Sequence, residues 1–170
     1  RQRQMCIRDR QGICSTLKAQ MNGFKPHLLE GVTGSGKTEI YIECIKEVTA
    51  RGHQALVIIP EIGLTPQTKH RFEAALACEV PIIHSGLTET ERGRTWAMAR
   101  SGAARVVLGT RSSVFCSFRA LGLIIVDEEH DPSFRQQDHP RYSARDVAVK
   151  RAQICNCPII MGSALSLIHI

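Results

Sequence analysis

The feature that most constrains this 170-residue sequence is the stretch GVTGSGKT at residues 31–38. It fits the pattern G-x-x-x-x-G-K-[ST], with a short apolar strand candidate before it and a helical run after it. In that context the glycines let backbone N–H groups point at phosphate oxygens, and the helix adds its positive dipole end. The stretch therefore predicts a nucleotide-binding loop, in which Lys37 reaches the β- and γ-phosphates and Thr38 binds Mg²⁺. The nucleotide contacts are expected from Gly31, Thr33, Gly34, Ser35, Gly36, Lys37 and Thr38.

A second candidate nucleotide contact lies upstream, at Gln11. Apolar residues recur every four positions at Ile13, Leu17 and Met21, which predicts a short helix over residues 12–21. Gln11 lies just before this helix. Its amide offers both a donor and an acceptor, so it can read the adenine edge of ATP, and a solvated surface glutamine is the alternative.

The composition is that of an ordinary globular protein. Its net positive charge is compatible with an anionic partner but does not require one. The chain is 43% apolar and 22% charged, and no apolar run approaches the roughly 20 residues that span a bilayer. We therefore expect one domain, no membrane partner and a cytoplasmic location. The seven cysteines are scattered without a C-x-x-C pair, so a zinc site is not supported. The first ten residues carry four Arg and one Asp, which is +3 of the net charge of +6.

Short apolar runs alternate with longer amphipathic runs along the rest of the chain. Continuously apolar strands, each followed by a helix, predict a doubly wound α/β fold with a mostly parallel sheet covered by helices on both faces. Ligands of such sheets bind at the carboxyl ends of the strands. The expected strands are residues 27–29, 55–59, 80–84, 105–108, 123–126 and 158–161, and the expected helices are residues 12–21, 39–51, 64–76, 89–100 and 144–154.

An apolar strand at residues 123–126 ends in the acidic run Asp127, Glu128, Glu129, His130. With a phosphate loop upstream, Asp127 is expected to hold Mg²⁺ through water, and Glu128 to orient and deprotonate the water that attacks the γ-phosphate. A solvated acidic turn is the alternative. The order D-E-x-H is typical of superfamily 2 helicases, in which His130 would relay between the nucleotide site and residues 162–164. For His130 the alternative is a solvated loop histidine.

Two segments that follow strands are candidates for gripping nucleic-acid phosphates. Residues 60–68 (PEIGLTPQT) and 109–113 (GTRSS) each follow a strand and open a helix, where hydroxyls and free N–H groups gather. Helix capping by Thr65 and Ser112 is the alternative. The expected DNA contacts in these segments are Thr65, Gln67, Thr110, Arg111 and Ser112.

Residues 131–146 interleave aromatic and cationic side chains directly after the acidic run. Phe134 or Tyr142 can stack unpaired bases while Arg135 and Arg141 meet the backbone, and stacking is worth about 1–3 kcal/mol per base. The alternative is a surface loop whose aromatic residues only pin it to the core.

Six stretches of the sequence together resemble the PriA family of primosomal replication helicases. They are GVTGSGKTE, PEIGLTPQT, HSGL, GTRSS, DEEHD and QQDHPRYSARD. The resemblance covers residues 11–164 and implies the first RecA-like P-loop NTPase lobe of a bacterial ATP- and Mg²⁺-dependent 3′-to-5′ DNA helicase in replication restart. It also implies single-stranded and forked DNA, primosome proteins and single-strand-binding proteins as partners. Zinc is expected only in a cysteine-rich insertion that this sequence lacks.

The sequence departs from that family at both ends. Residues 1–10 and 165–170 are expected to be non-native or disordered, and Leu165 replaces the Thr-Pro that follows Gly-Ser-Ala in the family. The second lobe with its arginine finger has no counterpart here. Because such a finger contributes about 10³ to 10⁵ in rate, this chain alone is expected to bind ATP and hydrolyse it slowly. A nucleotide-binding switch, a small-molecule kinase and an inactive fragment are the alternatives.

Overall fold

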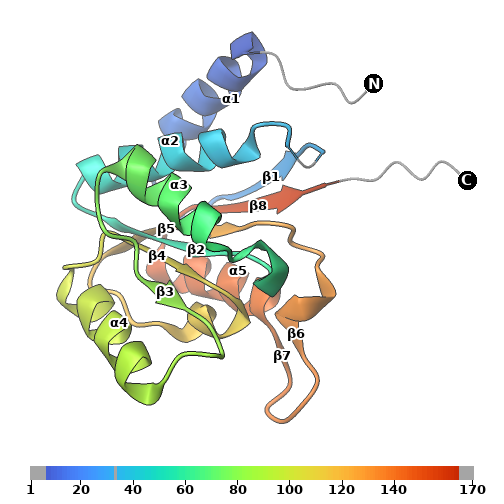
Figure 1. Ribbon diagram of the computed structural model, residues 1–170. Coiled ribbons are helices and arrows are strands. Elements are labelled where there is room, and N and C mark those ends of the chain that lie inside the picture. The colour runs from blue at the N-terminus through green and yellow to red at the C-terminus, as the bar shows by residue number, and fades with distance from the viewer. Residues whose placement is uncertain (1–6, 33, 165–170) are drawn as a thin grey trace, which may run out of the picture.

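A six-stranded parallel sheet runs through the computed structural model, which describes residues 7–32 and 34–164 (Figure 1). The order across the sheet is β1-β8-β5-β2-β4-β3. The strands are β1 (Pro26–Glu30), β2 (Gln54–Ile58), β3 (Ile82–Ile83), β4 (Val106–Gly109), β5 (Leu121–Val126) and β8 (Ile159–Ser163). Because all neighbouring pairs are parallel, every strand delivers its carboxyl end to the same edge. The predicted parallel α/β sheet is confirmed.

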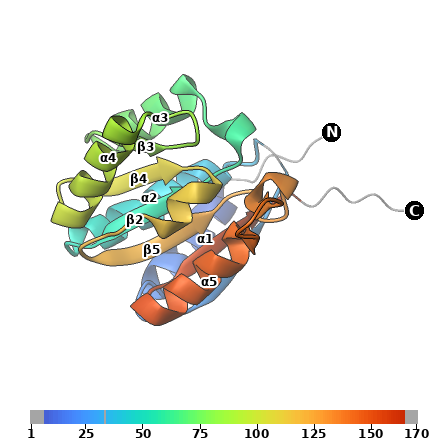
Figure 2. The ribbon, with the colours of Figure 1, turned by 90° about the horizontal axis from the view of Figure 1, so that it is seen from below.

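Helices cover both faces of the sheet. The helices are α1 (Ile7–Ala19), α2 (Lys37–Ala50), α3 (Pro66–Leu76), α4 (Glu89–Ser101) and α5 (Ala144–Cys155). Side chains of α1, α2 and α3 join one apolar core, and side chains of α4 and α5 join a second core on the other face. In Figure 2, α5 crosses the near side of the sheet while α1 and α2 lie behind it.

The continuous apolar strands divide their side chains between the two cores. In β2, Val57 packs in the first core, while Leu56 and Ile58 pack in the second, and all three are fully buried. β5 alternates in the same way, with Ile125 in the first core and Ile124 in the second. A strand buried on both faces needs apolar residues at every position, which explains the lack of polar alternation in the sequence.

Helix boundaries follow local capping chemistry. Thr65 caps α3 by accepting a hydrogen bond from the Thr68 N–H, and proline occupies the first helical position. Thr88 and Glu91 form a capping box at the start of α4. That helix ends at Gly102, whose φ of 85° lies in the left-handed region that favours glycine.

Two parts of the chain differ from the sequence predictions. Helix α1 begins at Ile7, earlier than the helix expected over residues 12–21, so residues 7–10 belong to a helix. Residues 1–6 and 165–170 lie outside the described residues, and their foreign origin stays a prediction. The second difference is a small hairpin of β6 (Arg135–Gln136) and β7 (Tyr142–Ser143), which extends away from the main sheet (Figure 1).

The hairpin follows one of three short 3-10 turns, η1 (Glu61–Gly63), η2 (Arg111–Phe115) and η3 (Pro132–Phe134). Each turn begins just beyond the carboxyl edge of the main sheet, after β2, β4 and β5 respectively. None of the helices in residues 7–32 and 34–164 is long and apolar enough to cross a membrane.

Candidate functional site

The phosphate loop connects the carboxyl end of β1 to α2. Gly34 and Gly36 have φ values of 79° and 96°, a left-handed conformation that residues with a side chain seldom adopt. The Gly31 N–H donates to the carbonyl of Ser163 at 3.0 Å, which joins the loop to the end of β8. The predicted contact Thr33 lies outside the described residues. The glycines therefore shape the loop as the motif predicts.

Lys37 links the phosphate loop to the acidic run. Its side chain is only 6% exposed, and its Nζ donates to the Gly31 carbonyl at 2.7 Å and to Glu128 Oε1 at 3.3 Å. A buried ammonium needs such partners, because an unpaired buried charge is costly. Two motifs that are 91 residues apart in the sequence therefore meet at one cation.

The cradle around Lys37 fits a phosphate group. The Ser35 hydroxyl is buried and has no hydrogen-bond partner among the described residues. A Cβ placed on Gly31 would lie 2.6 Å from that hydroxyl, so the loop closes around it only with glycine there. The first N–H groups of α2 are free of intrahelical acceptors by the geometry of a helix start. A phosphate would supply acceptors for the hydroxyl, for these N–H groups and for the Lys37 ammonium.

Asp127 lies directly after β5 and is held by a residue that the sequence analysis missed. Tyr41 Oη donates to Asp127 Oδ1 at 2.7 Å, and Tyr41 is only 1% exposed. Burial raises the pKa of Asp127 above its ordinary value, although the Tyr41 hydrogen bond lowers it in part. Burial likewise raises the pKa of Tyr41, so its hydroxyl remains a donor. The position of Tyr41, one helical turn after Lys37, was the available signal.

The acidic run turns sharply after Asp127. Glu128 has a φ of 49°, in the left-handed region, and its carbonyl accepts from the Asp131 N–H at 2.8 Å. Such a conformation in a residue with a side chain is held by its surroundings and is frequent at functional sites. Here it accompanies the ion pair between the Glu128 carboxylate and Lys37.

Glu129 and His130 connect the acidic run to neighbouring elements. The Glu129 carboxylate forms an ion pair with Arg145 of α5 at 2.9 Å, and its N–H donates to the Gly162 carbonyl. His130 is exposed, and its Nδ1 lies 3.4 Å from the Ser163 hydroxyl. The structure thus places His130 beside the segment to which the sequence analysis connected it. The relay role itself stays a prediction.

A cavity of about 280 Å³ lies beside the acids, between α2, α3 and the end of β5. Thr38 and Asp127, the two predicted Mg²⁺ residues, both line it, as does Glu128. Hydroxyl and carboxylate oxygens are ligands that Mg²⁺ prefers, usually with several waters retained. The residues present therefore fit a hydrated Mg²⁺ next to a phosphate. Across the described residues, no group of three His, Cys, Asp or Glu side chains is arranged to hold a metal ion by itself.

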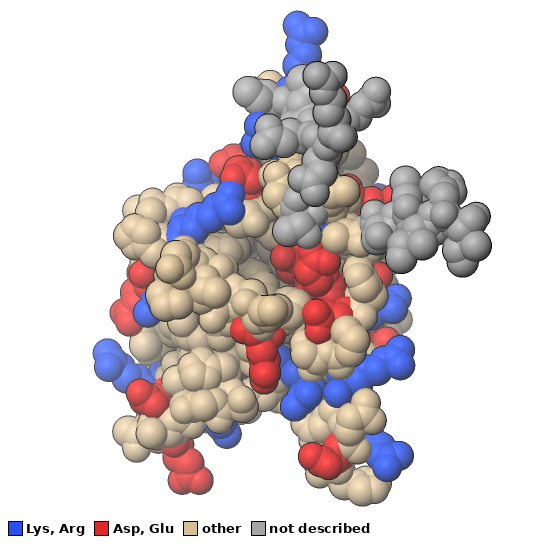
Figure 3. Space-filling view, turned by 45° about the vertical axis from the view of Figure 1, so that its right-hand side comes forward, with Lys and Arg blue, Asp and Glu red and all other residues tan. Residues whose placement is uncertain are grey.

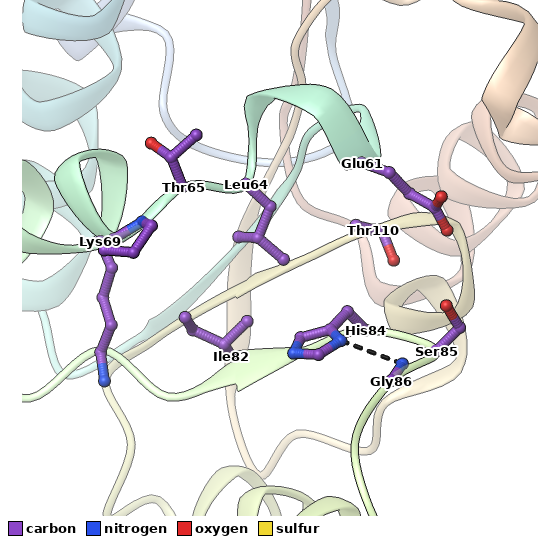
Figure 4. Close-up of a pocket in the computed structure, with 10 residues that line it drawn as sticks. Glu61, Leu64, Thr65, Lys69, Ile82, His84, Ser85, Gly86 and Thr110 are labelled. Atoms are coloured by element: carbon purple, nitrogen blue, oxygen red, sulfur yellow. Dashed lines mark hydrogen bonds between the residues drawn. The ribbon is translucent and has the colours of Figure 1, made fainter.

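A second, larger cavity of about 550 Å³ lies farther along the same edge, between η1, α3 and β3. Figure 4 shows Leu64 and Ile82 on its two walls, with the polar ends of Glu61, Ser85 and Thr110 gathered at one end. Thr65 also lines it. The cavity therefore brings together one predicted DNA contact from each of the two phosphate-gripping segments, Thr65 and Thr110.

The predicted DNA contacts in these segments differ in how free their side chains are. Thr65 caps α3 with its hydroxyl, which is the alternative to DNA contact that the sequence left open. Gln67 is exposed. Thr110 is buried at the N-cap position of η2, so Ser112 is not the cap there. Arg111 donates from Nη1 to the Ser133 carbonyl at 3.0 Å, which directs it toward the 3-10 turn η3. The Ser112 hydroxyl is buried and has no hydrogen-bond partner within residues 7–32 and 34–164.

The structure corrects the prediction for Phe134. This ring is 1% exposed and belongs to the core under α5, so it is not available to stack on a base. Tyr142 is half-buried and packs edge-to-face against Phe115, with ring centroids 5.0 Å apart. Phe115 is 50% exposed and was missed because it lies outside the aromatic-rich segment. Phe115, at the end of η2, contacts Tyr142 because the fold brings these two distant segments of the chain together.

The two predicted backbone contacts, Arg135 and Arg141, are both exposed on the small hairpin. Arg141 donates to the carbonyl of Gln137 at 3.0 Å within that hairpin. In Figure 3, acidic atoms gather near the middle of the displayed face, and basic atoms form a band below them.

Gln11 is an exposed residue inside α1, not a residue before the helix as expected. Its neighbour Arg10 extends to the phosphate loop, where a Cβ on Gly36 would lie 2.8 Å from the Arg10 Cδ. The start of α1 is thus close to the loop. The predicted contact between Gln11 and adenine stays a prediction.

A parallel α/β domain with a phosphate loop and a DEEH acidic run at one edge defines a nucleotide-binding motor domain of the RecA-like type. The DEAD/DEAH box helicase model matches residues 13–164, so the chain belongs to the DEAD/DEAH box helicase family. Members of this class use ATP, generally with Mg²⁺.

Among individual relatives, the chain is similar to replication restart protein PriA from several bacteria. It is 54% identical to the Haemophilus influenzae protein over 84% of this chain and 20% of that protein. The Bacillus subtilis protein is 48% identical over 82% of this chain and 17% of that protein. The chain thus spans about one fifth of the length of these curated relatives.

Solved structures support the fold. RecG bound to a three-way DNA junction matches with a TM-score of 0.65 and 22% identity, over 91% of this chain and 20% of RecG. The DUF1998 helicase MrfA bound to DNA and AMPPNP matches with a TM-score of 0.67 and 15% identity, over 94% of this chain and 24% of MrfA. At these identities the likeness concerns the fold alone.

Proposed function

We propose that this chain is the ATP-binding motor lobe of a DNA helicase that acts in replication restart. The observation that carries the proposal is the contact between Lys37 of the phosphate loop and Glu128 of the acidic run, in a buried site that fits a phosphate and Mg²⁺. Similarity to the replication restart proteins supports the biological role. The whole protein is proposed to translocate 3′-to-5′ on single-stranded and forked DNA in the cytoplasm, with primosome and single-strand-binding proteins as partners.

In this proposal each residue of the nucleotide site has a defined task. Lys37 exchanges its bond to Gly31 for the β- and γ-phosphates, while Thr38 and, through water, Asp127 hold Mg²⁺. Bound Mg²⁺ neutralises charge that develops on the phosphates. Glu128, released from Lys37, orients the attacking water and accepts its proton. His130 relays the state of the site to Ser163.

DNA is proposed to lie along the larger cavity and the hairpin. Thr65 and Thr110 line the cavity, and Gln67, Arg111 and Ser112 are close to them in the sequence. Arg135, Arg141 and Tyr142 would extend the DNA-binding surface along β6 and β7. In the solved structures whose fold this chain shares, RecG is bound to a three-way DNA junction and the helicase MrfA is bound to DNA. Gln11 is proposed to contact adenine, and zinc is proposed only for parts of the longer relatives that this chain does not span.

The proposal is tested by binding of a fluorescent ATP analogue to the 170-residue chain with and without Mg²⁺. Lys37→Ala should weaken binding at least about tenfold, because it removes charge-assisted hydrogen bonds to phosphate. Lys46→Ala is the matched control, since Lys46 is an exposed lysine of the same helix that pairs only with Glu43 among the described residues. Equal binding by the parent chain and Lys37→Ala would contradict the proposal.

A nucleotide-binding switch remains the second candidate because the phosphate loop alone would serve it. Stimulation of ATP hydrolysis by single-stranded DNA distinguishes a motor from a switch. It requires a longer chain that includes the second lobe of a relative. No stimulation in such a two-lobe protein would favour the switch.

A further inference from the structure

Tyr41 makes a buried contact at the nucleotide site that the motifs do not explain. Its ring is 1% exposed on α2, and its hydroxyl donates to Asp127 Oδ1 at 2.7 Å. Both residues line the 280 Å³ cavity together with Thr38. The phenol therefore occupies one oxygen of the carboxylate that is proposed to hold Mg²⁺.

Gly162 of β8 provides the room for this contact. A Cβ on Gly162 would lie 1.8 Å from Tyr41 Oη and 2.6 Å from Asp127 Oδ1. The Gly162 carbonyl also accepts from the Glu129 N–H at 2.9 Å, which keeps β8 against the acidic run. Three elements, α2, β5 and β8, thus meet at one hydrogen bond, and only a residue without a side chain leaves space for it.

We propose that Tyr41 is a positioning residue for Mg²⁺ binding, an inference that rests on the proposed function. By holding Oδ1, the phenol fixes the rotation of the Asp127 side chain and leaves Oδ2 for a water ligand of Mg²⁺. A carboxylate already fixed in this way binds its ligand without a further loss of rotamer freedom. Tyr41 does not contact the phosphate itself, because Lys37, Ser35 and the start of α2 form that cradle.

Because the phosphate cradle and the Tyr41–Asp127 pair are separate, the proposal predicts which step of binding depends on the Tyr41 hydroxyl. Nucleotide binding without Mg²⁺ depends on the phosphate cradle and should not require the Tyr41 hydroxyl. The increase in affinity that Mg²⁺ provides should require it. Loss of one hydrogen bond to a charged group corresponds to roughly a tenfold effect.

The test uses Tyr41→Phe in the 170-residue chain, with Thr49→Val as a control that also removes one hydroxyl from α2. Among the residues that the structure describes, the Thr49 hydroxyl donates only to carbonyls of its own helix, those of Ile45 and Lys46. A fluorescent ATP analogue is titrated first in EDTA and then at increasing Mg²⁺, and circular dichroism verifies folding. For Tyr41→Phe we expect unchanged affinity in EDTA and a Mg²⁺ midpoint raised about five- to tenfold. For Thr49→Val we expect no change in either quantity.

A midpoint within twofold of the parent, or a lower one, would overturn the positioning role. A second measurement on the parent chain does not depend on how the variant folds. The sequence contains two tyrosines, so fluorotyrosine labelling gives two ¹⁹F resonances, and Tyr142→Phe assigns them. The Tyr41 resonance should shift when Mg²⁺ is added to the nucleotide complex, and no shift would overturn the inference. Failure of the parent to bind nucleotide would instead overturn the proposed function, and this inference with it.

Discussion

The two ends of the carboxyl edge hold their polar side chains in different ways. Around the phosphate loop, Lys37 pairs with Glu128 and Tyr41 pairs with Asp127, all within a few residues of a strand end or helix start. On the nucleic-acid side, the hairpin arginines are exposed, and Thr65 serves first as a helix cap. One end is a connected buried network, and the other is a set of separate surface groups.

The difference reflects what each end is proposed to bind. A phosphate is recognised largely by backbone N–H groups and one lysine, which a continuous sequence motif can supply. A nucleic-acid strand is recognised by side chains that remain exposed on several loops, and exposure is decided by packing between distant segments. Substitutions at the two ends should therefore differ in whether they alter stability, binding or both.

The largest expected effect tests the assignment of Phe134 to the core. Phe134→Ala should lower the free energy of unfolding by about 3–5 kcal/mol, because it opens a cavity under α5. Tyr142→Ala, on the same segment but half-buried, should cost less than half as much. Urea unfolding monitored by circular dichroism measures both. Equal small losses would show that Phe134 is a surface ring, as the sequence analysis predicted.

The next effect separates stability from binding at the nucleotide end. Burial raises the pKa of Asp127, so protonation of this carboxylate is more favourable in the native state than in the unfolded chain. The stabilising contribution of the protonated form is present below the ordinary pKa of 3.8 and is lost as the pH rises through the folded-state pKa. At pH 7 the charged carboxylate therefore destabilises the fold. Asp127→Asn should raise the melting temperature at pH 7 and flatten its dependence on pH.

The same variant should lose Mg²⁺-dependent nucleotide binding by at least about tenfold, because an amide replaces the charged oxygen. Melting is measured in EDTA so that no metal contributes. Asp146→Asn is the control, since Asp146 is an exposed acid at the start of α5. Increased stability together with unchanged Mg²⁺-dependent binding would remove Asp127 from the metal site.

A smaller effect concerns Thr65, which has both a structural and a proposed binding role. Thr65→Ala removes the cap of α3 and should lower the free energy of unfolding by about 1 kcal/mol. Thr65→Ser keeps a hydroxyl and should retain most of that stability. If Thr65 also contacts DNA, binding of a labelled oligonucleotide should weaken with alanine and persist with serine. Loss of stability without any loss of binding would leave Thr65 as a cap only.

Sequence reasoning predicted the fold well because its signals are local. Continuous apolar strands indicated a sheet buried on both faces, and the strand ends carried the motifs to one edge. The shortest strand of the main sheet, β3, was expected over residues 80–84 but covers only Ile82–Ile83, the part of the segment that pairs with β4. The start of α1 was placed too late because its first turn mixes charges without apolar spacing.

Site residues that belong to a local sequence motif could be predicted. Site residues that are defined by contacts between distant segments were harder to predict. Lys37, Asp127 and Glu128 were named from motifs and do meet. Tyr41 was missed because its partner is 86 residues away. Its spacing from Lys37 places it on the same side of α2 but does not by itself show that contact. For the same reason Phe134 was expected at the surface and is buried, while the exposed Phe115 was not predicted at all. Composition marks a segment as aromatic, but only packing decides which ring faces solvent.

The smallest expected effect would define the nucleic-acid end. Arg141→Ala should weaken binding of a single-stranded oligonucleotide by roughly threefold and reduce the slope of log K against log salt by about 0.7, the value for one phosphate contact. Arg119→Ala is a suitable control, because Arg119 is an exposed arginine whose cavity lies at the opposite, amino-terminal edge of the sheet. Fluorescence anisotropy at several salt concentrations measures the slope for each variant. If both arginines changed it equally, binding would follow net charge, and the hairpin would have no special part in it. A change confined to Arg141 would instead place the strand on the hairpin side of the carboxyl edge, next to the acidic run whose state it is proposed to sense.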